Sequence, residues 1–397
     1  MNISRLIPAP PVIRLFVFVG MVWAAVVGPI STIIILSYMG ATNPQLGMFS
    51  AAAALISVFC QPGWGYLADK LKSPRKVLCS CLASSAFFFA LVLFTDNLYI
   101  AIVFLLLDVV FRCCVISLLD SHTLQEVAVI PGLQYSHIRL AGSVFFGFTS
   151  FMFSIAMDNH GVMVIIPISF SIAMVTVLWG FFAAKGRYEA PREQASGTKA
   201  VKGNIKKDAI TLLKQKWFMI FILFGALSAM AMQPTFVFMI EFVYQVGGTP
   251  GQVPLIHALR CVVEVPVFIL VGIFGKRIPT KTLLIIAICF NFIFVIGLVF
   301  STSFIMLTIS HLFGATIGFI FNLTGRLRYI NENSPESVRS TSITVMSTFD
   351  IGLAAIIGNL VAGFILGMFS TRILSVFLLA PLILSAVLLI FLPKKPI

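Results

Sequence analysis

The chain has 397 residues, of which 59% are hydrophobic and 10% charged, and its formal net charge is +13. A soluble globular domain is about one-quarter charged, so this composition cannot cover a water-facing surface. It excludes a soluble enzyme, a disordered tail and a coiled coil. It predicts an all-α membrane protein that crosses the bilayer many times.

Twelve apolar runs, bounded by Gly, Pro, Asn or charged residues, predict twelve transmembrane helices. The first six lie near residues 13–38, 48–67, 77–95, 99–120, 137–157 and 162–184. The second six lie near residues 217–243, 253–274, 282–300, 304–324, 341–366 and 373–392. We expect the first run to be retained, because it is longer than a signal-peptide core and lacks a small-residue cleavage site.

A polar, basic stretch divides these runs into two sets of six. The expected organisation is an N-terminal half at 1–184, a basic cytoplasmic linker at 185–216 and a C-terminal half at 217–397. This layout is typical of secondary transporters whose substrate binds at the midplane between the halves. Residues 205–215 carry apolar residues at helical spacing between lysines, which predicts a short helix on the inner membrane surface.

The basic residues predict the orientation. If the N-terminus is cytoplasmic, 24 of the 27 Lys and Arg residues fall in cytoplasmic segments, and only Arg372 faces outward. This bias predicts a multi-pass protein of the cell (plasma) membrane with both termini in the cytoplasm. Attraction to anionic membrane lipids follows from it. A patch for nucleic acid or another anion is the weaker alternative, so no nucleic-acid partner is expected.

Neither catalysis nor metal binding is indicated. The seven cysteines lie inside apolar runs without metal-ligand spacing, which predicts packing roles and no metal site. The sequence contains no His-Glu-x-x-His motif and no Gly-x-Ser-x-Gly motif. We therefore expect no catalytic residues and no cofactor.

Charged residues inside the apolar runs are the strongest functional signal. Each costs about 2.5–3.5 kcal/mol at the centre of a span, so each should face protein or water and have a partner. Asp108 and Arg112 stand four residues apart, as do Arg260 and Glu264, so each pair meets on one helix face. The alternative is that such pairs only neutralise each other. The other candidates are Asp120, Glu241, His311 and Asp350.

Proton coupling needs a carboxyl that exchanges its proton with water in one conformation. Burial raises the pKa of a carboxyl and a nearby Arg lowers it, so moving the Arg acts as a switch. Glu264 beside Arg260, or Asp120 beside Arg139, fits this requirement. Substrate contacts are expected from aromatic, amide and charged groups at Trp23, Arg112, Phe146, Gln233, Arg260, Asn291 and Asp350. Pro234 follows Gln233 and should free a carbonyl in its span.

Residues 61–76 read QPGWGYLADKLKSPRK. This segment resembles the loop signature between helices two and three of the major facilitator superfamily. The resemblance implies the major facilitator fold, with two pseudo-symmetric six-helix halves. It assigns conformational gating to Gly65, Asp69 and Arg75, with Gly65 allowing close helix approach.

Three further segments resemble the lactose-permease and phenylpropionate-permease-like branch of that superfamily. Residues 135–147, YSHIRLAGSVFFG, are similar to the motif that opens helix five, which implies an Asp120–Arg139 ion pair and sugar stacking on Phe146. Residues 260–268, RCVVEVPVF, resemble a helix-eight segment whose Glu is functional, here Glu264. Residues 310–313, SHLF, resemble the helix-ten His motif, here His311.

Together these observations predict a proton-coupled symporter that imports a small polar solute, such as a sugar or oligosaccharide, by alternating access. Asp120, Arg139, Glu264 and His311 are the expected proton-coupling residues, and the resemblance implies a monomer driven by the proton gradient. Uptake of an aromatic acid or a nucleoside is one alternative, in which Arg112 and Arg139 bind a carboxylate. Export of a drug or metabolite is another. A non-transporting receptor or scramblase also stays open.

Overall fold

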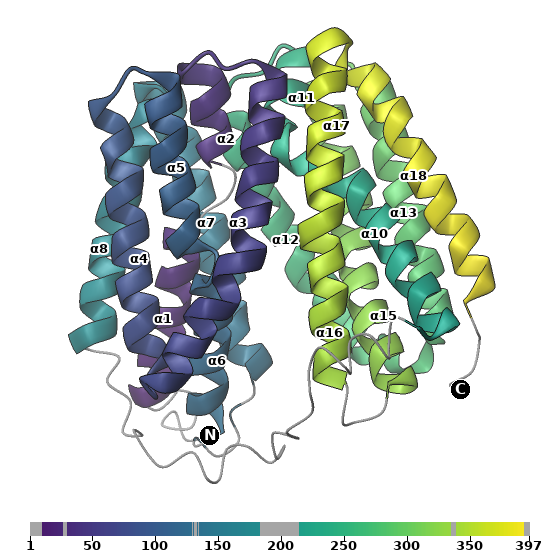
Figure 1. The fold of residues 1–397 in the computed structure, drawn as a ribbon, viewed down its shortest axis with the longest axis horizontal. Helices are drawn as coiled ribbons and strands as arrows, with labels where there is room; N and C mark the ends of the chain where they lie inside the picture. Colours follow the sequence, from purple (N-terminus) through teal and green to yellow (C-terminus); the bar gives the residue numbers. More distant parts are fainter. Residues whose placement is uncertain are drawn as a thin grey trace, which may run out of the picture. The chain divides into compact units, whose positions relative to one another are not determined.

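The computed structural model describes residues 10–26, 30–128, 130, 133, 135–182, 214–334 and 339–392. These residues form helices joined by short connections, with no strand in the described ranges (Figure 1). Nearly all of the predicted linker and of its surface helix lies outside them. The chain divides into two compact units, Met1–Gly40 with Ile56–Lys199, and Ala41–Leu55 with Ala200–Ile397.

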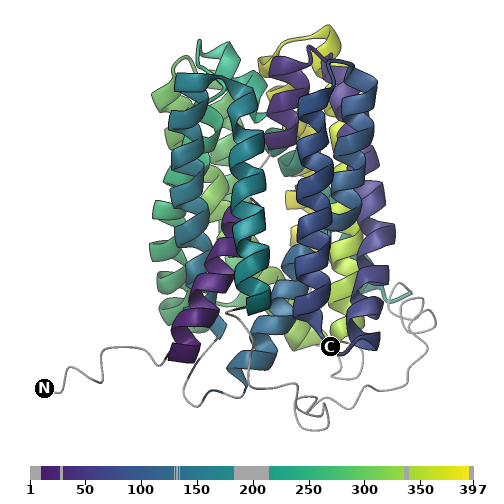
Figure 2. The same ribbon diagram turned by 90° about the vertical axis from the view of Figure 1, so that its left-hand side faces the viewer.

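The first unit contains the helices of the N-terminal part of the chain. They are α1 (Pro10–Ala25), α2 (Ile30–Ile33), the later part of α3 (Asn43–Lys70), α4 (Pro74–Leu91), α5 (Leu98–Arg112), α6 (Val115–Val127), α7 (Tyr135–His160) and α8 (Ile165–Phe182). Figure 2 shows α1 beside α7 and α8, against which it packs. Fully buried side chains such as Phe18 and Leu119 form the core of this unit.

The second unit contains the start of α3 and the helices after the predicted linker. They are α10 (Lys216–Val237), α11 (Met239–Gln245), α12 (Gln252–Phe274), α13 (Thr280–Phe300), α14 (Phe304–Ile309), α15 (Ile317–Asn333), α16 (Arg339–Ser347), α17 (Ala355–Met368) and α18 (Thr371–Phe391). Two π-helical segments, Ser310–Thr316 and Thr348–Ala354, connect α14 to α15 and α16 to α17. A core of buried phenylalanines, including Phe221 and Phe294, holds this unit together.

Within the described residues, eleven helices are long and apolar enough to cross a membrane, and Pro11–Ala25 is a shorter apolar helix. In the range 13–38, where one span is predicted, the described elements are α1 up to Ala25, α2 at Ile30–Ile33 and a π-helical segment at Ile34–Tyr38; residues 27–29 lie outside the described residues. The fourth span is longer than predicted, because α5 and α6 together cover Leu98–Val127.

Residues 41–55 group with the second unit. Glycines explain this grouping. A Cβ placed on Gly47 would lie 2.7 Å from the Asn359 carbonyl oxygen, and one on Gly363 would lie 2.8 Å from the Asn43 carbonyl oxygen. The start of α3 and helix α17 therefore approach closely at positions where any side chain would clash.

The turn between α3 and α4 follows the Schellman pattern. The Ser73 amide donates to the Ala68 carbonyl at 3.2 Å, and the Lys72 amide donates to the Asp69 carbonyl at 3.2 Å. Lys72 has φ 51°, the left-handed conformation that glycine usually supplies. Pro74 then begins α4, where its missing N–H costs no hydrogen bond.

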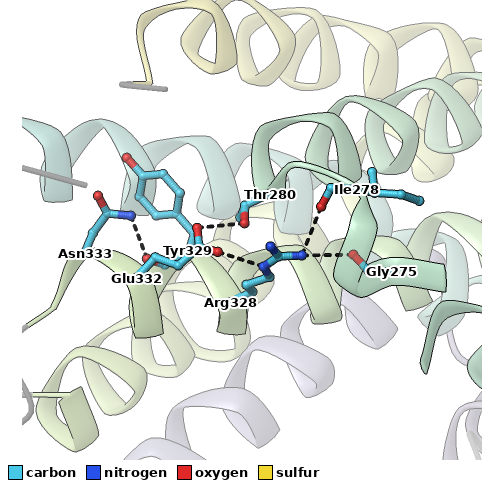
Figure 3. A network of polar contacts seen from close by, with 7 residues as sticks. All are labelled: Gly275, Ile278, Thr280, Arg328, Tyr329, Glu332 and Asn333. Carbon is cyan, nitrogen blue, oxygen red and sulfur yellow. Dashed lines mark hydrogen bonds and ion pairs between the residues drawn. The ribbon is translucent and has the colours of Figure 1, made fainter. Parts of the chain in front are cut away.

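A polar network fixes the connection between α12 and α13 to the end of α15 (Figure 3). Arg328 donates to the carbonyl oxygens of Gly275 and Ile278, both at 2.9 Å. Its Nε atom pairs with Glu332 at 2.7 Å, and the Thr280 hydroxyl donates to the same carboxylate at 2.7 Å. One guanidinium thus binds two carbonyls at this helix end, of which the Gly275 carbonyl also accepts from the Ile278 amide at 3.1 Å.

Candidate functional site

The pair predicted on α12 is formed. Arg260 Nε lies 3.4 Å from Glu264 Oε2, and both side chains are largely buried, with 18% and 14% exposed. The guanidinium also lies over two rings, 5.0 Å from the centre of Phe319 and 5.5 Å from that of Phe236. A carboxylate, a cation and aromatic faces therefore meet around one turn of α12.

Two buried histidines adjoin this pair. The ring centres of His257 and His311 are 6.1 Å apart, and His311 is fully buried, packed edge-on against Phe236 and Phe294. Within the described part of the chain, neither ring nitrogen of His311 has a hydrogen-bond partner. His311 also lies in the π-helical segment Ser310–Thr316, and such segments are frequent at functional sites. We call His257, Arg260, Glu264 and His311 the α12 cluster.

Asn291, one of the predicted substrate contacts, is buried within the same unit. Its amide donates to the Ser228 hydroxyl at 3.4 Å, and Gly318 leaves room for its side chain. Gln233 is half-buried on α10, next to Pro234. Asn291 therefore joins α13 to α10, an arrangement that fits packing as well as it fits substrate contact.

Asp350 pairs with Arg326, a residue that the sequence analysis counted only among the basic cytoplasmic residues. The two side chains form a two-point ion pair and are 14% and 6% exposed. The Arg326 guanidinium lies 5.2 Å from the centre of the Phe221 ring, in the space that Gly225 leaves open. No local pattern could indicate this pair, because its members lie 24 residues apart on different helices.

The second predicted pair, Asp108 with Arg112 on α5, lies inside the first unit. Arg112 Nη2 is 2.7 Å from Asp108 Oδ2, and the Ser85 hydroxyl donates to Asp108 Oδ1 at 2.5 Å. The pair borders a cavity of about 20 Å³, measured as the space open to the centre of a water molecule, which Ser169 also lines. That volume suits about one water, so Arg112 has no room beside it for a larger solute in this cavity.

Asp120 and Arg139 lie around Tyr135, which the sequence analysis did not single out. The Tyr135 hydroxyl donates to Asp120 Oδ1 at 2.7 Å. Burial, followed by the hydrogen bond to Asp120, raises the pKa of Tyr135 above its ordinary value, while Arg139 lowers it. The Arg139 guanidinium lies 4.0 Å from the centre of the Trp23 ring. The Tyr135 hydroxyl therefore bridges the predicted pair of Asp120 and Arg139, and the Trp23 ring covers the Arg139 guanidinium.

Phe146 extends this group, with its ring centre 6.3 Å from that of Trp23. Gly142 makes the arrangement possible, because an added Cβ there would lie 2.6 Å from Trp23 and 2.7 Å from Arg139. Two predicted substrate contacts, Trp23 and Phe146, thus lie with the predicted coupling residue Arg139. Asp120 and Arg139 belong to the first unit, whereas Glu264 and His311 belong to the second.

The predicted gating residues lie around the end of α3. Asp69 is exposed and Arg75 is half-buried at the start of α4. The close helix approach expected at Gly65 is not seen in the described residues, where nothing lies within 4 Å of its Cβ position. Within the same residues, no group of three or more His, Cys, Asp or Glu side chains could hold a metal ion.

Comparisons with known proteins agree with this architecture. The family model described as "MFS_1 like family" matches residues 13–377. The maltose permease of Geobacillus stearothermophilus is 24% identical over 363 residues, covering 89% of this chain and 87% of the permease. The uncharacterized transporter YwbF of Bacillus subtilis (strain 168) is 21% identical over 313 residues, covering 78% of this chain and 75% of YwbF.

Solved structures show the same fold. A variant of the nucleoside transporter NupG superposes with a TM-score of 0.81 at 15% identity, covering 97% of this chain and all of the other. A bacterial homolog of the human lysosomal transporter Spinster, inward-facing and unoccupied, gives a TM-score of 0.69 at 11% identity, with 96% of each chain covered. These likenesses confirm the predicted all-α membrane fold of the major facilitator type.

Proposed function

We infer the function from one premise: this chain belongs to the MFS_1 like family and is a multi-pass membrane transporter of the major facilitator type. We propose that it is a proton-coupled symporter that imports a small polyhydroxylated solute, an oligosaccharide first among them, by alternating access. We further propose that it acts as a monomer in the cell membrane, with both termini in the cytoplasm and the proton gradient as its only energy source.

The observation that carries proton coupling is the α12 cluster. Glu264 is 14% exposed, and its carboxylate lies 3.4 Å from the Arg260 guanidinium. His311 lies beside this pair with two ring nitrogens that have no partner among the described residues. A carboxyl, an arginine and an imidazole in one buried group are the components that a proton relay needs.

The solute class follows from the chemistry of the α12 cluster and, in the first unit, of the aromatic residues near Arg139. An arginine and a carboxylate can bind neighbouring hydroxyl groups of a sugar ring through charge-assisted hydrogen bonds. Trp23 and Phe146 offer aromatic faces near Arg139, and sugars stack on such faces. The similarity to a maltose permease, which covers most of this chain, supports an oligosaccharide as the first candidate.

A nucleoside is the second candidate, because two phenylalanine rings flank Arg260. Phe236 and Phe319 lie 5.5 and 5.0 Å from its guanidinium carbon. An aromatic base can stack between such groups while the ribose hydroxyls bind the charged pair. The nucleoside transporter NupG shares the fold at a TM-score of 0.81.

The test is uptake into proteoliposomes that hold the purified protein. Radiolabelled maltose and uridine are compared with and without an inward proton gradient. The proposal expects one of them to accumulate only when the gradient is imposed, and not in liposomes without protein. Uptake of neither solute against its gradient, in protein that remains folded, contradicts the proposed substrate class. Uptake that ignores the pH gradient contradicts proton coupling.

A further inference from the structure

A groove opens in the first unit between α3, α4 and α5. Its volume is about 140 Å³, measured as the space open to the centre of a water molecule. This is several times the size of the water-sized cavity beside Asp108. Trp64, Leu67 and Phe111 line it, together with buried Val77 and Cys81 and half-buried Ser84. We call this the α3–α4 groove.

The walls of the groove present apolar surface whose polar group is already satisfied. The Trp64 indole N–H donates to the Val110 carbonyl oxygen at 2.8 Å, so the ring offers no unmet donor to the groove. The Trp64 and Phe111 rings are 5.4 Å apart and tilted by 41°. Because Trp64, Leu67, Val77 and Phe111 make much of the lining apolar, a hydrocarbon chain can pack against it.

The mouth of the groove is polar and basic. Lys76 and Ser80 are exposed and line it, together with exposed Leu71. The adjacent turn at residues 69–76 carries four basic residues and one acidic residue. A lysine stem can lie along apolar surface while its ammonium group reaches the headgroup region. The groove therefore combines an apolar body with a positive rim, the complement of a lipid that has an acyl chain and an anionic headgroup.

We propose that the α3–α4 groove is a binding site for an anionic phospholipid of the membrane leaflet beside the α3–α4 turn. An acyl chain lies along the apolar lining that Trp64, Leu67 and Phe111 share, and the phosphate lies against Lys76. The position of Trp64, half-buried near the basic end of a spanning helix, suits the membrane–water interface, where tryptophans gather. This site does not depend on the proposed solute or on proton coupling.

The test uses Trp64 itself as the probe. The purified protein is placed in bilayers that contain phosphatidylglycerol or phosphatidylcholine with brominated acyl chains, which quench nearby tryptophan fluorescence. The signal of Trp64 is isolated by subtracting the fluorescence of W64F. Because one basic residue near the surface is worth about a fivefold preference for anionic lipid, quenching of Trp64 should require about fivefold less brominated phosphatidylglycerol than phosphatidylcholine.

Two variants distinguish the headgroup contact from the acyl-chain contact. K76Q should remove the preference for phosphatidylglycerol, and S80F, which fills the mouth, should weaken quenching by both lipids. K216Q is the matched control, because exposed Lys216 adjoins Trp217 in the other unit and is not among the residues that line the groove. It should leave the quenching of Trp64 unchanged. Soluble glycerol 3-phosphate should not relieve the quenching, because it has no acyl chain.

Several results would overturn the proposal. Equal quenching of Trp64 by both brominated lipids would show that no anionic lipid is selected. If K76Q still prefers phosphatidylglycerol, Lys76 does not bind the headgroup. If glycerol 3-phosphate fully relieves the quenching of Trp64, the ligand is a free phosphate and not a lipid. Trp64 fluorescence that neither lipid quenches would show that the groove is closed to acyl chains.

Discussion

Arg326 on α15 and Asp350, in the π-helical segment before α17, form a buried two-point ion pair that ties two helices of the second unit together. The second contact of the pair, from Arg326 Nη2 to Asp350 Oδ1, measures 3.2 Å. Phe221 and the open space at Gly225 complete the surroundings of the guanidinium. This geometry favours a structural role for Asp350, which the sequence analysis placed among the substrate contacts.

Replacing Asp350 with Ala should therefore destabilise the protein strongly. Removing one partner of a buried ion pair leaves an uncompensated charge, which costs about 3–5 kcal/mol. The measurement is thermal unfolding of the purified variant in detergent. D96N, which changes an exposed acid in the first unit, should change stability by less than about 0.5 kcal/mol. If D350A unfolds at the same temperature as D96N but no longer binds solute, Asp350 is a substrate contact.

Gly225 should not tolerate a methyl group. A Cβ at this position would overlap the Arg326 guanidinium, and overpacking of this kind costs about 1–3 kcal/mol. Gly272 on α12 is the matched control, because nothing lies within 4 Å of its Cβ position. G272A should leave the unfolding temperature unchanged or raise it, since Ala favours a helix more than Gly does. Equal unfolding temperatures for G225A and G272A would contradict the packing described here.

Replacing Lys72, the left-handed residue in the α3–α4 turn, with Gly should stabilise the protein. Lys72 has φ 51°, a conformation that costs a residue with a side chain about 1 kcal/mol more than glycine. K72G should therefore raise the stability of the first unit by about 0.5–1 kcal/mol, measured by thermal unfolding. K70G, which changes the last residue of the helical part of α3, should lower it. A loss of stability in K72G would contradict the turn geometry.

The Tyr135–Asp120 contact should be insensitive to pH over a wide range. Burial and the carboxylate acceptor both favour the neutral phenol, so the pKa of Tyr135 is raised in the folded protein. The stability that the hydrogen bond adds is therefore kept through about pH 10, where an unperturbed tyrosine ionises, and is lost only at higher pH. The difference in stability between wild type and Y135F should stay constant from about pH 6 to about pH 10. Ionisation of Tyr135 at its ordinary pKa, seen as a tyrosinate band absent from Y135F, would contradict this.

The spacing of charged residues in the sequence was sufficient to predict an ion pair where both partners lie on one helix. Residues four apart on a helix share a face, so the pairs Asp108–Arg112 and Arg260–Glu264 could be predicted from their positions in the chain. The membrane spans could be predicted as well, because a long apolar run has few alternatives.

Contacts between different helices could not be predicted in this way, because no local spacing in the sequence indicates them. The Arg326–Asp350 pair joins two helices that nothing in the local pattern relates, and Arg326 looked like one more basic residue near a cytoplasmic end. Tyr135 was also missed, although it opens the segment that suggested the Asp120–Arg139 pair. The grouping of residues 41–55 with the second unit depends on glycines of α3 and α17 that meet only in the folded chain.

The most direct test of the proton-coupling claim is solute accumulation by E264Q in proteoliposomes. With one proton per solute, an imposed gradient of one pH unit supports about tenfold accumulation, and wild type and D96N should approach it. E264Q should stay at the concentration outside while still exchanging internal for external solute, because Gln keeps the shape of the side chain and removes its titration. Accumulation by E264Q equal to that of wild type would contradict the assignment of Glu264.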